Sequence, residues 1–321
     1  MSSPLTPSSP TLSIVCPMHD EGLAMDAFFA RLLPVLQTGG DSFEIVCVND
    51  GSQDDTLDRL RRLQATLPGL RVIDLARNFG KEAALTCGID AALGQAVIPI
   101  DADLQDPPEL IPEMLRLWRA GFEVVLPQRI DRSQDGLLKR KSADWFYRLH
   151  NRISDEPLPA NVGDFRLMDR QVVDAVKRLP ERRRFMKGLF AWVGFRQAMI
   201  PYQRAARSAG RTKFSGWRLW NLALEGITSF STAPLRIWTY VGLLVALLAF
   251  VYAVVIIGRT LILGIDLPGY ASLITVVLFL GGIQLIGLGV LGEYLGRLYS
   301  EAKARPVYIV REQFDGPGDA A

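Results

Sequence analysis

Two long stretches without charge lie in the C-terminal third of the chain and constrain its fold more than any other feature. Residues 237–258 and 271–292 contain no Asp, Glu, Lys or Arg, whereas charged residues are frequent as far as Arg236. Each stretch is about 22 residues long, which is enough for a helix to cross a hydrocarbon layer of about 30 Å. A helix pair buried in a soluble core is disfavoured, because core helices usually keep one polar face. The pattern predicts two transmembrane helices within residues 236–296.

The residues that flank these stretches predict the sides of the membrane. Two spans return the chain to its starting side, so the segments before and after them share one compartment. That side carries Arg236, Arg297, Lys303 and Arg305, while the short connection has Arg259 and Asp266. The positive-inside rule therefore predicts a multi-pass protein of the inner (plasma) membrane with the N-terminal region and both termini in the cytoplasm.

Overall composition excludes some other classes of protein. A net charge of +2 gives no support for nucleic acid as a partner. Cys16, Cys47 and Cys87 lie in apolar stretches without metal-binding spacing, so we interpret them as buried residues of a reducing compartment. Residues 1–10 are rich in Ser and Pro, lack the apolar segment of a signal peptide, and are expected to form a disordered extension.

The region between residues 12 and 127 alternates short apolar runs with longer amphipathic ones. Strands buried on both faces are predicted at residues 12–16, 43–48, 71–75, 96–100 and 123–126. Helices are predicted between them at residues 23–36, 54–67, 81–93 and 108–120. This alternation predicts an α/β fold with a doubly wound, mostly parallel sheet. In such sheets, ligands bind at the carboxyl ends of the strands.

Acidic loops follow three of these predicted strands, at residues 17–22, 49–52 and 101–106. In the third loop, Asp101, Asp103 and Gln105 alternate where the strand ends, so their side chains are expected to face one ligand. Hard oxygen donors suit Mg²⁺ or Mn²⁺. A cation held by carboxylates stabilises the charge that builds up on a departing diphosphate. Acidic turns are common, but the position after an apolar strand favours a metal site.

The first two loops offer polar groups that suit a nucleotide. Glu21 and Asp50 follow predicted strands, where a carboxylate accepts hydrogen bonds from a base or from ribose hydroxyls. The alternative for Asp50 is a helix-capping role, because Gly51 and Ser52 are also typical of a helix start. His19 is one of only two histidines, and contact with the nucleotide is favoured over general acid or base catalysis.

Five motifs in order along the chain resemble those of family 2 polyprenyl-phosphate glycosyltransferases. They are Pro-x-x-Asp-Glu at 17–21, Asn-Asp-Gly-Ser at 49–52, Arg-Asn-Phe-Gly-Lys-Glu at 77–82, Asp-Ala-Asp-Leu-Gln-Asp-Pro-Pro-Glu at 101–109 and Gly-Asp-Phe-Arg-Leu at 163–167. The resemblance covers nearly the whole chain from residue 12 to the second apolar stretch. It implies a GT-A fold, an inverting transfer of sugar and a nucleoside diphosphate bound through a metal.

Carried over by position, the resemblance assigns residues to two subsites. The nucleotide would contact Pro17, His19, Glu21, Asp50, Ser52, Lys81 and Asp101, and the metal would be held by Asp101, Asp103 and Gln105. Two positions depart from the family pattern. His19 stands where relatives often have Tyr, which weakens a stacking role there, and Asn49 precedes Asp50 where Asp-Asp is frequent, so recognition would pass to Asp50 alone.

Basic residues before the spans are candidates for binding the acceptor. The segment at residues 210–215 resembles the family's acceptor loop, and its Arg211 and Lys213 can grip anionic oxygen. Arg129 and Arg140 are further candidates for the acceptor phosphate. The alternative is a basic juxtamembrane segment attracted to anionic lipid.

The resemblance also brings in Asp164, from the motif at residues 163–167. A phosphate acceptor is already anionic at neutral pH and hardly needs a base. We therefore expect Asp164 to orient the acceptor or to bind sugar hydroxyls. The residues expected to act in catalysis are Asp103, Asp164, Arg211 and Lys213.

A further amphipathic segment precedes the first span. Trp217, Trp220, Leu224 and Ile227 recur at helical spacing, which predicts a helix lying in the membrane interface. Residues 137–153 are a second candidate for such a helix. The predicted organisation is an extension (1–10), a GT-A domain (11–210), the acceptor loop with the interfacial helix (211–235), two spans (236–296) and a cytoplasmic tail (297–321).

These features together predict sugar transfer from a nucleotide sugar, preferably UDP-glucose or UDP-N-acetylglucosamine, to undecaprenyl or another polyprenyl phosphate. Three alternatives stay open: a catalytically silent adaptor that binds nucleotide sugar, a GDP-mannose-dependent synthase, and a processive synthase, for which two spans are too few within one chain. The second span has a small-residue face that permits close helix packing, so a homo-oligomer through the spans is a further hypothesis. That face consists of Gly281, Gly282, Gly287, Gly289 and Gly292.

Overall fold

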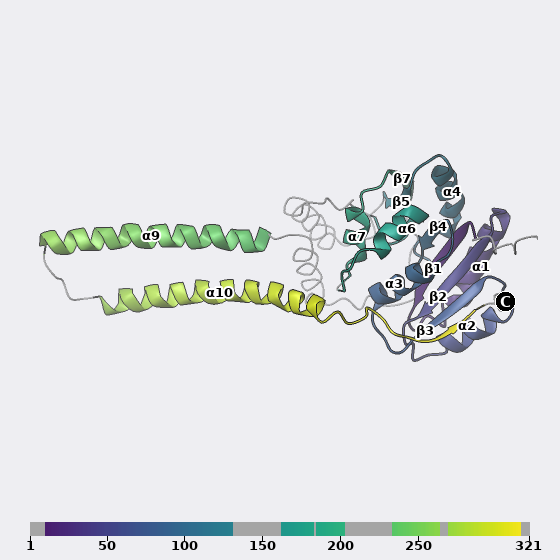
Figure 1. Cartoon of the computed structure of the whole chain (residues 1–321), viewed down its shortest axis with the longest axis horizontal. Helices are drawn as coiled ribbons and strands as arrows, with labels where there is room; N and C mark the ends of the chain where they lie inside the picture. The colour runs from purple at the N-terminus through teal and green to yellow at the C-terminus, as the bar shows by residue number, and fades with distance from the viewer. Residues whose placement is uncertain (1–9, 131–161, 183, 203–232, 264–268, 316–321) are drawn as a thin grey trace, which may run out of the picture.

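The computed structural model describes residues 10–130, 162–182, 184–202, 233–263 and 269–315. They form an α/β unit and a pair of long helices, α9 (Ala233–Leu263) and α10 (Tyr270–Ala302). The two long helices lie side by side and extend away from the α/β unit (Figure 1). The two predicted apolar stretches lie within these long helices.

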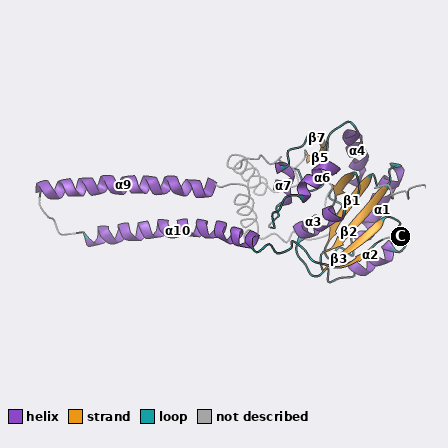
Figure 2. Ribbon diagram, viewed as in Figure 1, coloured by secondary structure: helices purple, strands orange, loops and turns teal. Residues whose placement is uncertain are grey.

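One eight-stranded sheet runs through the described part of the α/β unit, in the order β7-β5-β6-β4-β1-β2-β3-β8. Figure 2 shows strands of this sheet between helices of the unit. Its strands are β1 (Leu12–Met18), β2 (Phe43–Asn49), β3 (Leu70–Leu75), β4 (Ala96–Pro99), β5 (Val124–Arg129), β6 (Leu167–Asp169), β7 (Gln197–Tyr202) and β8 (Val310–Phe314). Among the first four strands, β1 pairs in parallel with β2 and β4, and β2 pairs in parallel with β3, which confirms the predicted α/β sheet. Strands β6 and β8 run antiparallel to theirs, and neither was predicted from the sequence.

Helices cover both faces of the sheet. They are α1 (Met25–Thr38), α2 (Thr56–Gln64), α3 (Lys81–Ala91), the 3-10 turn η1 (Pro108–Leu110), α4 (Ile111–Arg119), α6 (Arg170–Lys177) and α7 (Met186–Trp192). Because successive strand residues point to opposite faces, Ile14 of β1 packs with α1 and α4, whereas Val15 packs with α3, α6 and α7. The apolar runs are thus buried on both sides, as expected for a doubly wound sheet.

Close packing of α3 on the sheet places the start of this helix at the strand ends. A Cβ on Gly88 would lie 2.3 Å from Val15 Cγ1, so a larger residue there would push the helix away from β1. Cys16, Cys47 and Cys87 are all buried with free thiols, which agrees with the interpretation of these residues as small core side chains.

The long helices expose apolar side chains along their described length. Among the described residues, one segment, Phe279–Ala302 in α10, is long and apolar enough to cross a membrane, and none of its apolar window is buried. In α9 the apolar stretch Tyr240–Ile256 is shorter. Leu243 in α9 and Leu285 in α10 are 68% and 70% exposed, so these helices do not form the core of a soluble domain. The chain also continues past the predicted spans into the sheet, because β8 lies beyond α10.

Candidate active site

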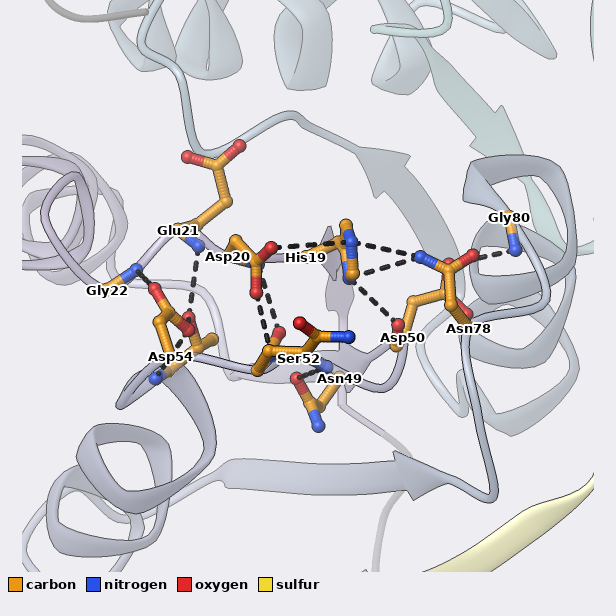
Figure 3. Close-up of polar contacts among 12 residues, drawn as sticks. His19, Asp20, Glu21, Gly22, Asn49, Asp50, Ser52, Asp54, Asn78 and Gly80 are labelled. Atoms are coloured by element: carbon orange, nitrogen blue, oxygen red, sulfur yellow. Dashed lines mark hydrogen bonds and ion pairs between the residues drawn. The ribbon is translucent and has the colours of Figure 1, made fainter.

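The loops that follow β1 and β2 are joined by hydrogen bonds at the carboxyl edge of the sheet (Figure 3). The backbone N–H of Asp20 donates to Ser52 Oγ at 3.0 Å, and the backbone N–H of Gln53 donates to Asp20 Oδ1 at 2.8 Å. The backbone N–H of Glu21 donates to Thr56 Oγ1 at 3.0 Å. Asp20 has a φ of 55°, a left-handed conformation that is rare outside glycine and is often found at functional sites.

Asp50 fixes the loop that leads into α3. Its side chain is buried, and its two carboxylate oxygens accept from the backbone N–H groups of Phe79 at 2.7 Å and Gly80 at 2.9 Å. His19 Nδ1 lies 3.0 Å from the Asp50 carbonyl oxygen, and Asn78 Nδ2 lies 3.0 Å from His19 Nε2. A proton on His19 Nδ1 satisfies both contacts. Nδ1 then donates to the Asp50 carbonyl oxygen, and the unprotonated Nε2 accepts from the amide of Asn78. Asp50 therefore determines where α3 begins.

A pocket of about 390 Å³ opens beside these loops, within the size range of small-molecule sites. Gly51 allows the loop of Asn78 to close one side of it, because Gly51 has a φ of 61° and a Cβ there would lie 2.5 Å from Asn78 N. The buried carboxylate of Asp74 accepts from Asn49 Nδ2 at 2.7 Å. The lining residues are His19, Asn49, Gly51, Ser52, Gln53, Leu57, Asp74, Ala76, Arg77, Asn78 and Arg311.

Lys81, the first residue of α3, bridges two carboxylates. Its Nζ lies 2.6 Å from Asp101 Oδ2 and 2.9 Å from Asp164 Oδ2. Burial alone would raise the pKa of Asp164, but Lys81 and then Lys187 outweigh it, and the pKa of this carboxyl lies below its usual value. Burial alone would lower the pKa of Lys81, but the charges of Asp101 and Asp164 outweigh burial, and the pKa of Lys81 lies above its usual value. Lys81 and Asp164 are thus held in their charged forms at neutral pH.

The turn after β4 carries the predicted metal ligands. Asp103 Oδ1 accepts from the backbone N–H of Gln105 at 3.1 Å, and Leu104 between them has a φ of 58°. Tyr202 at the end of β7 donates to Asp106 Oδ1 at 2.8 Å, which fixes the end of the turn. The described residues contain no group of three or more His, Cys, Asp or Glu side chains that could hold a metal by themselves. A cation bound here would therefore take the rest of its ligands from water or from a substrate.

Comparison with known proteins assigns this arrangement to a family. Residues 13–177 match the model of glycosyl transferase family 2. The chain belongs to this family. Residues 233–298 match a second model, the GtrB C-terminal hairpin, so the glycosyltransferase carries the long helices as a recognised part of its architecture.

Relatives of this glycosyltransferase match over almost its whole length. An uncharacterized glycosyltransferase of Synechocystis is 54% identical over 94% of this chain and 95% of its own. A prophage bactoprenol glucosyl transferase homolog of Escherichia coli is 53% identical over 94% of this chain and 98% of its own. A solved glucosyl-3-phosphoglycerate synthase from Mycobacterium tuberculosis is 20% identical, with a TM-score of 0.45 over 68% of this chain and 76% of that one. The family membership rests on the sequence matches.

The structure places the predicted site residues of the glycosyltransferase in distinct positions. His19 and Ser52 line the pocket, and Lys81, Asp101 and Asp164 meet in one cluster. Pro17 lies in β1, Glu21 and Asp50 are at the strand ends outside the pocket lining, and Arg129 is the last residue of β5. Arg140, Arg211, Lys213 and the predicted interfacial helices at 137–153 and 217–227 lie outside the described residues.

Several residues of the site were not predicted from the sequence. Asp74 had a detectable signal, because it is a carboxylate between Ile73 and Leu75 in a mostly apolar strand, and buried charges are rare unless they have a partner. Arg311 had none, since it lies 237 residues from Asp74 along the chain. Glu82 belongs to the motif at residues 77–82 but was assigned no role there, and Lys187 could be recognised only from the electrostatics of the folded site.

Glu82 gives the glycosyltransferase a measurable dependence of stability on pH. Its Oε2 accepts from the backbone N–H of Met186 at 3.1 Å, and burial, followed by the charge of Asp164, raises the pKa of Glu82 from 4.5 to about 7. The pKa is higher in the folded chain, so the stability from this group is complete below about pH 4.5 and is lost as pH rises through about 7. We expect a loss on the order of 2–3 kcal/mol.

Glu82→Gln is expected to remove this dependence, because glutamine keeps the acceptor for Met186 and cannot ionise. The measurement is thermal unfolding of both proteins between about pH 5 and 9, with the difference in melting temperature growing toward high pH. Parallel curves for the two proteins would contradict the assignment.

Proposed function

We propose that this glycosyltransferase moves a hexose from a nucleotide sugar, UDP-glucose or UDP-N-acetylglucosamine, to undecaprenyl or a similar polyprenyl phosphate, with inversion at the anomeric carbon. The observation that carries the proposal is the extent of the match to relatives named bactoprenol glucosyl transferases. The relative of this name from Shigella flexneri is 52% identical over 95% of this chain and 99% of its own. The likeness thus includes both the α/β unit and the helical hairpin, the two parts needed for a soluble donor and a lipid acceptor.

The donor is proposed to lie along the carboxyl edge of the sheet. Its nucleoside would occupy the pocket between His19, Asp74 and Arg77, and its diphosphate would extend toward Asp101 and Asp103. The pocket is of suitable volume and is lined by groups that accept and donate hydrogen bonds. We expect Pro17, Glu21 and Asp50 to support the loops around the nucleotide, and Ser52 to contact it.

The ligand chemistry at this edge fits a divalent cation. Mg²⁺ and Mn²⁺ usually take one or two carboxylates and complete their shell with water and substrate phosphates. Asp101 and Asp103 are proposed to supply two hard oxygen ligands and the side-chain oxygen of Gln105 a third. The backbone N–H of Gln105 also donates to Asp103 Oδ1 at 3.1 Å, which supports the turn. When bound, the cation stabilises negative charge on the departing diphosphate.

The proposed displacement needs orientation of the reactants more than a base. A phosphate oxygen of the acceptor forms the new bond to the anomeric carbon, and the bond from that carbon to the diphosphate oxygen breaks with its electron pair. The acceptor oxygen is already anionic, so no proton is transferred. Asp164, kept ionised beside Lys81, accepts hydrogen bonds from sugar hydroxyls and holds the anomeric carbon in line with the acceptor.

We further propose that α9 and α10 cross the bilayer as two spans and that the α/β unit lies at the cytoplasmic surface of the inner membrane. Its support is the exposure of apolar side chains along both helices and the basic residues at one end. Arg129, Arg140, Arg211 and Lys213 are the proposed contacts of the lipid phosphate. A homo-oligomer through the glycine face of α10 remains a hypothesis.

The proposal is tested by product formation. The purified chain, in detergent with Mg²⁺ and undecaprenyl phosphate, is mixed separately with UDP-glucose, UDP-N-acetylglucosamine and GDP-mannose. The mass of the lipid product is then measured by mass spectrometry. We expect the acceptor to gain the mass of one hexose or N-acetylhexosamine from a UDP donor. No lipid product from any donor, with the fold confirmed by circular dichroism, would defeat the proposal, and product from GDP-mannose alone would change the donor.

A further inference from the structure

The segment after α10 returns to the α/β unit and becomes the outermost strand of its sheet. β8 pairs antiparallel with β3, with Val72 opposite Phe314 and Asp74 opposite Glu312. Side-chain contacts hold the segment in place: Tyr308 Oη donates to Asp90 Oδ2 at 2.9 Å, Arg61 Nη2 to Glu312 Oε2 at 2.9 Å and Arg71 Nε to Asp315 Oδ1 at 3.2 Å. The C-terminal strand is therefore a fixed part of the sheet edge beside the pocket.

A bulge in β8 directs one side chain to the pocket. The pairing passes from Asp74 opposite Glu312 to Leu75 opposite Val310, which leaves Arg311 as the extra residue. Such bulges re-aim side chains next to functional sites. The guanidinium of Arg311 donates from Nη2 to the Ala76 carbonyl oxygen at 2.6 Å and from Nη1 to Asp74 Oδ2 at 3.4 Å.

The charges around Arg311 leave it able to bind a ligand. Asp74 is only 2% exposed and has its other oxygen on Asn49 Nδ2, while Arg311 is 59% exposed. A guanidinium has five N–H donors, and the two contacts to Asp74 and Ala76 use two of them. Arg77 lines the same pocket, and its guanidinium lies over the ring of Phe79, 4.3 Å from the ring centre. This side of the pocket thus offers N–H donors and a flat guanidinium face to a planar ligand that carries hydrogen-bond acceptors.

From this arrangement we infer that β8 forms one wall of the nucleotide subsite and that Arg311 binds the nucleoside diphosphate of the donor, an inference that rests on the proposed function. The guanidinium supplies donors to phosphate or ribose oxygens and a flat face to the base. The affinity for nucleotide then depends on β8, which follows α10 along the chain.

The test is titration of the full chain in detergent with UDP in the presence of Mn²⁺, followed by calorimetry. We expect Arg311→Ala to weaken UDP binding about tenfold or more, since it removes a charge-assisted contact. Gln313→Ala is the matched control on the same strand, because Gln313 is not among the described residues that line the pocket and its side chain donates to Asp315 Oδ1 at 2.8 Å. This variant is expected to bind UDP like the unaltered chain.

A double variant separates ligand binding from a structural role of Arg311. If Arg311 only neutralised Asp74, adding Asp74→Asn to Arg311→Ala would restore UDP binding to the level of Asp74→Asn alone. We expect instead that the double variant binds UDP as weakly as Arg311→Ala or more weakly. Full restoration, or unchanged binding in Arg311→Ala, overturns the inference and leaves the proposed function intact. Absence of UDP and GDP binding by the unaltered chain overturns both.

Discussion

Replacing Asp103 with asparagine is expected to lower the turnover of lipid-linked sugar by about 10²–10³-fold, the loss typical when one electrostatic stabiliser of a transition state is removed. Asp103 accepts from the backbone N–H of Gln105 through Oδ1, and an asparagine carbonyl oxygen can keep that bond. The variant therefore loses a negative charge and keeps the turn after β4. The measurement is the rate of formation of lipid product at saturating donor and acceptor.

Two further measurements connect that loss to a cation. The Mg²⁺ or Mn²⁺ concentration for half-maximal rate should rise in Asp103→Asn, while its melting temperature should stay within about 2 °C of the unaltered chain, as for a small surface change. Asp58→Asn is the matched control, because Asp58 is exposed on α2 and is not among the residues that line the pocket. Equal turnover in both variants would mean that Asp103 is no metal ligand.

The parallel core of the fold was predictable because it depends on local patterns. The five predicted strands and four predicted helices correspond to β1–β5, α1–α4 and η1, with ends displaced by a few residues. Periodicity in the sequence finds such elements since each one is buried by its immediate neighbours along the chain. β6, β7 and β8 were missed because they are short or exposed and gain their pairing from segments far away, as β8 does from β3.

The site was predictable where its residues follow strand ends, and not where tertiary contacts decide their role. Asp101 and Lys81 belong to motifs, yet their meeting with Asp164 depends on α3 packing against β1 and on the segment before β6. Asp50 illustrates the reverse case, because its position suggested a nucleotide contact, whereas both of its oxygens hold the backbone before α3. Its role at the nucleotide stays a prediction, and the structure adds a capping function.

Lys81→Met is expected to produce the second large effect, a fall in kcat/KM of about 10²-fold, because this cation lies between Asp101 and Asp164. Methionine keeps most of the apolar stem and removes the charge. Without Lys81, two carboxylates repel each other at the site where a diphosphate would bind, and the donor would meet a more negative surface.

The pH dependence of that variant distinguishes an electrostatic role from a packing role. Lys81 opposes the effect of burial on Asp164 and holds the pKa of this carboxyl below its usual value, so its removal raises that pKa. If turnover needs ionised Asp164, the acidic limb of the rate profile should move to higher pH in Lys81→Met and return toward its original position in Lys81→Arg, which restores the cation.

Lys177→Met provides the control for loss of a lysine, because Lys177 lies on α6 apart from the cluster and its Nζ donates to the backbone carbonyl oxygen of Asp90 at 2.9 Å. Its rate and its acidic limb should match those of the unaltered chain. A Lys81→Met protein that melts normally, turns over normally and keeps its acidic limb would show that the cluster of Lys81, Asp101 and Asp164 has no part in the transfer. A lower rate with an unmoved limb would leave Lys81 a contact of the donor and remove Asp164 from the proposed mechanism.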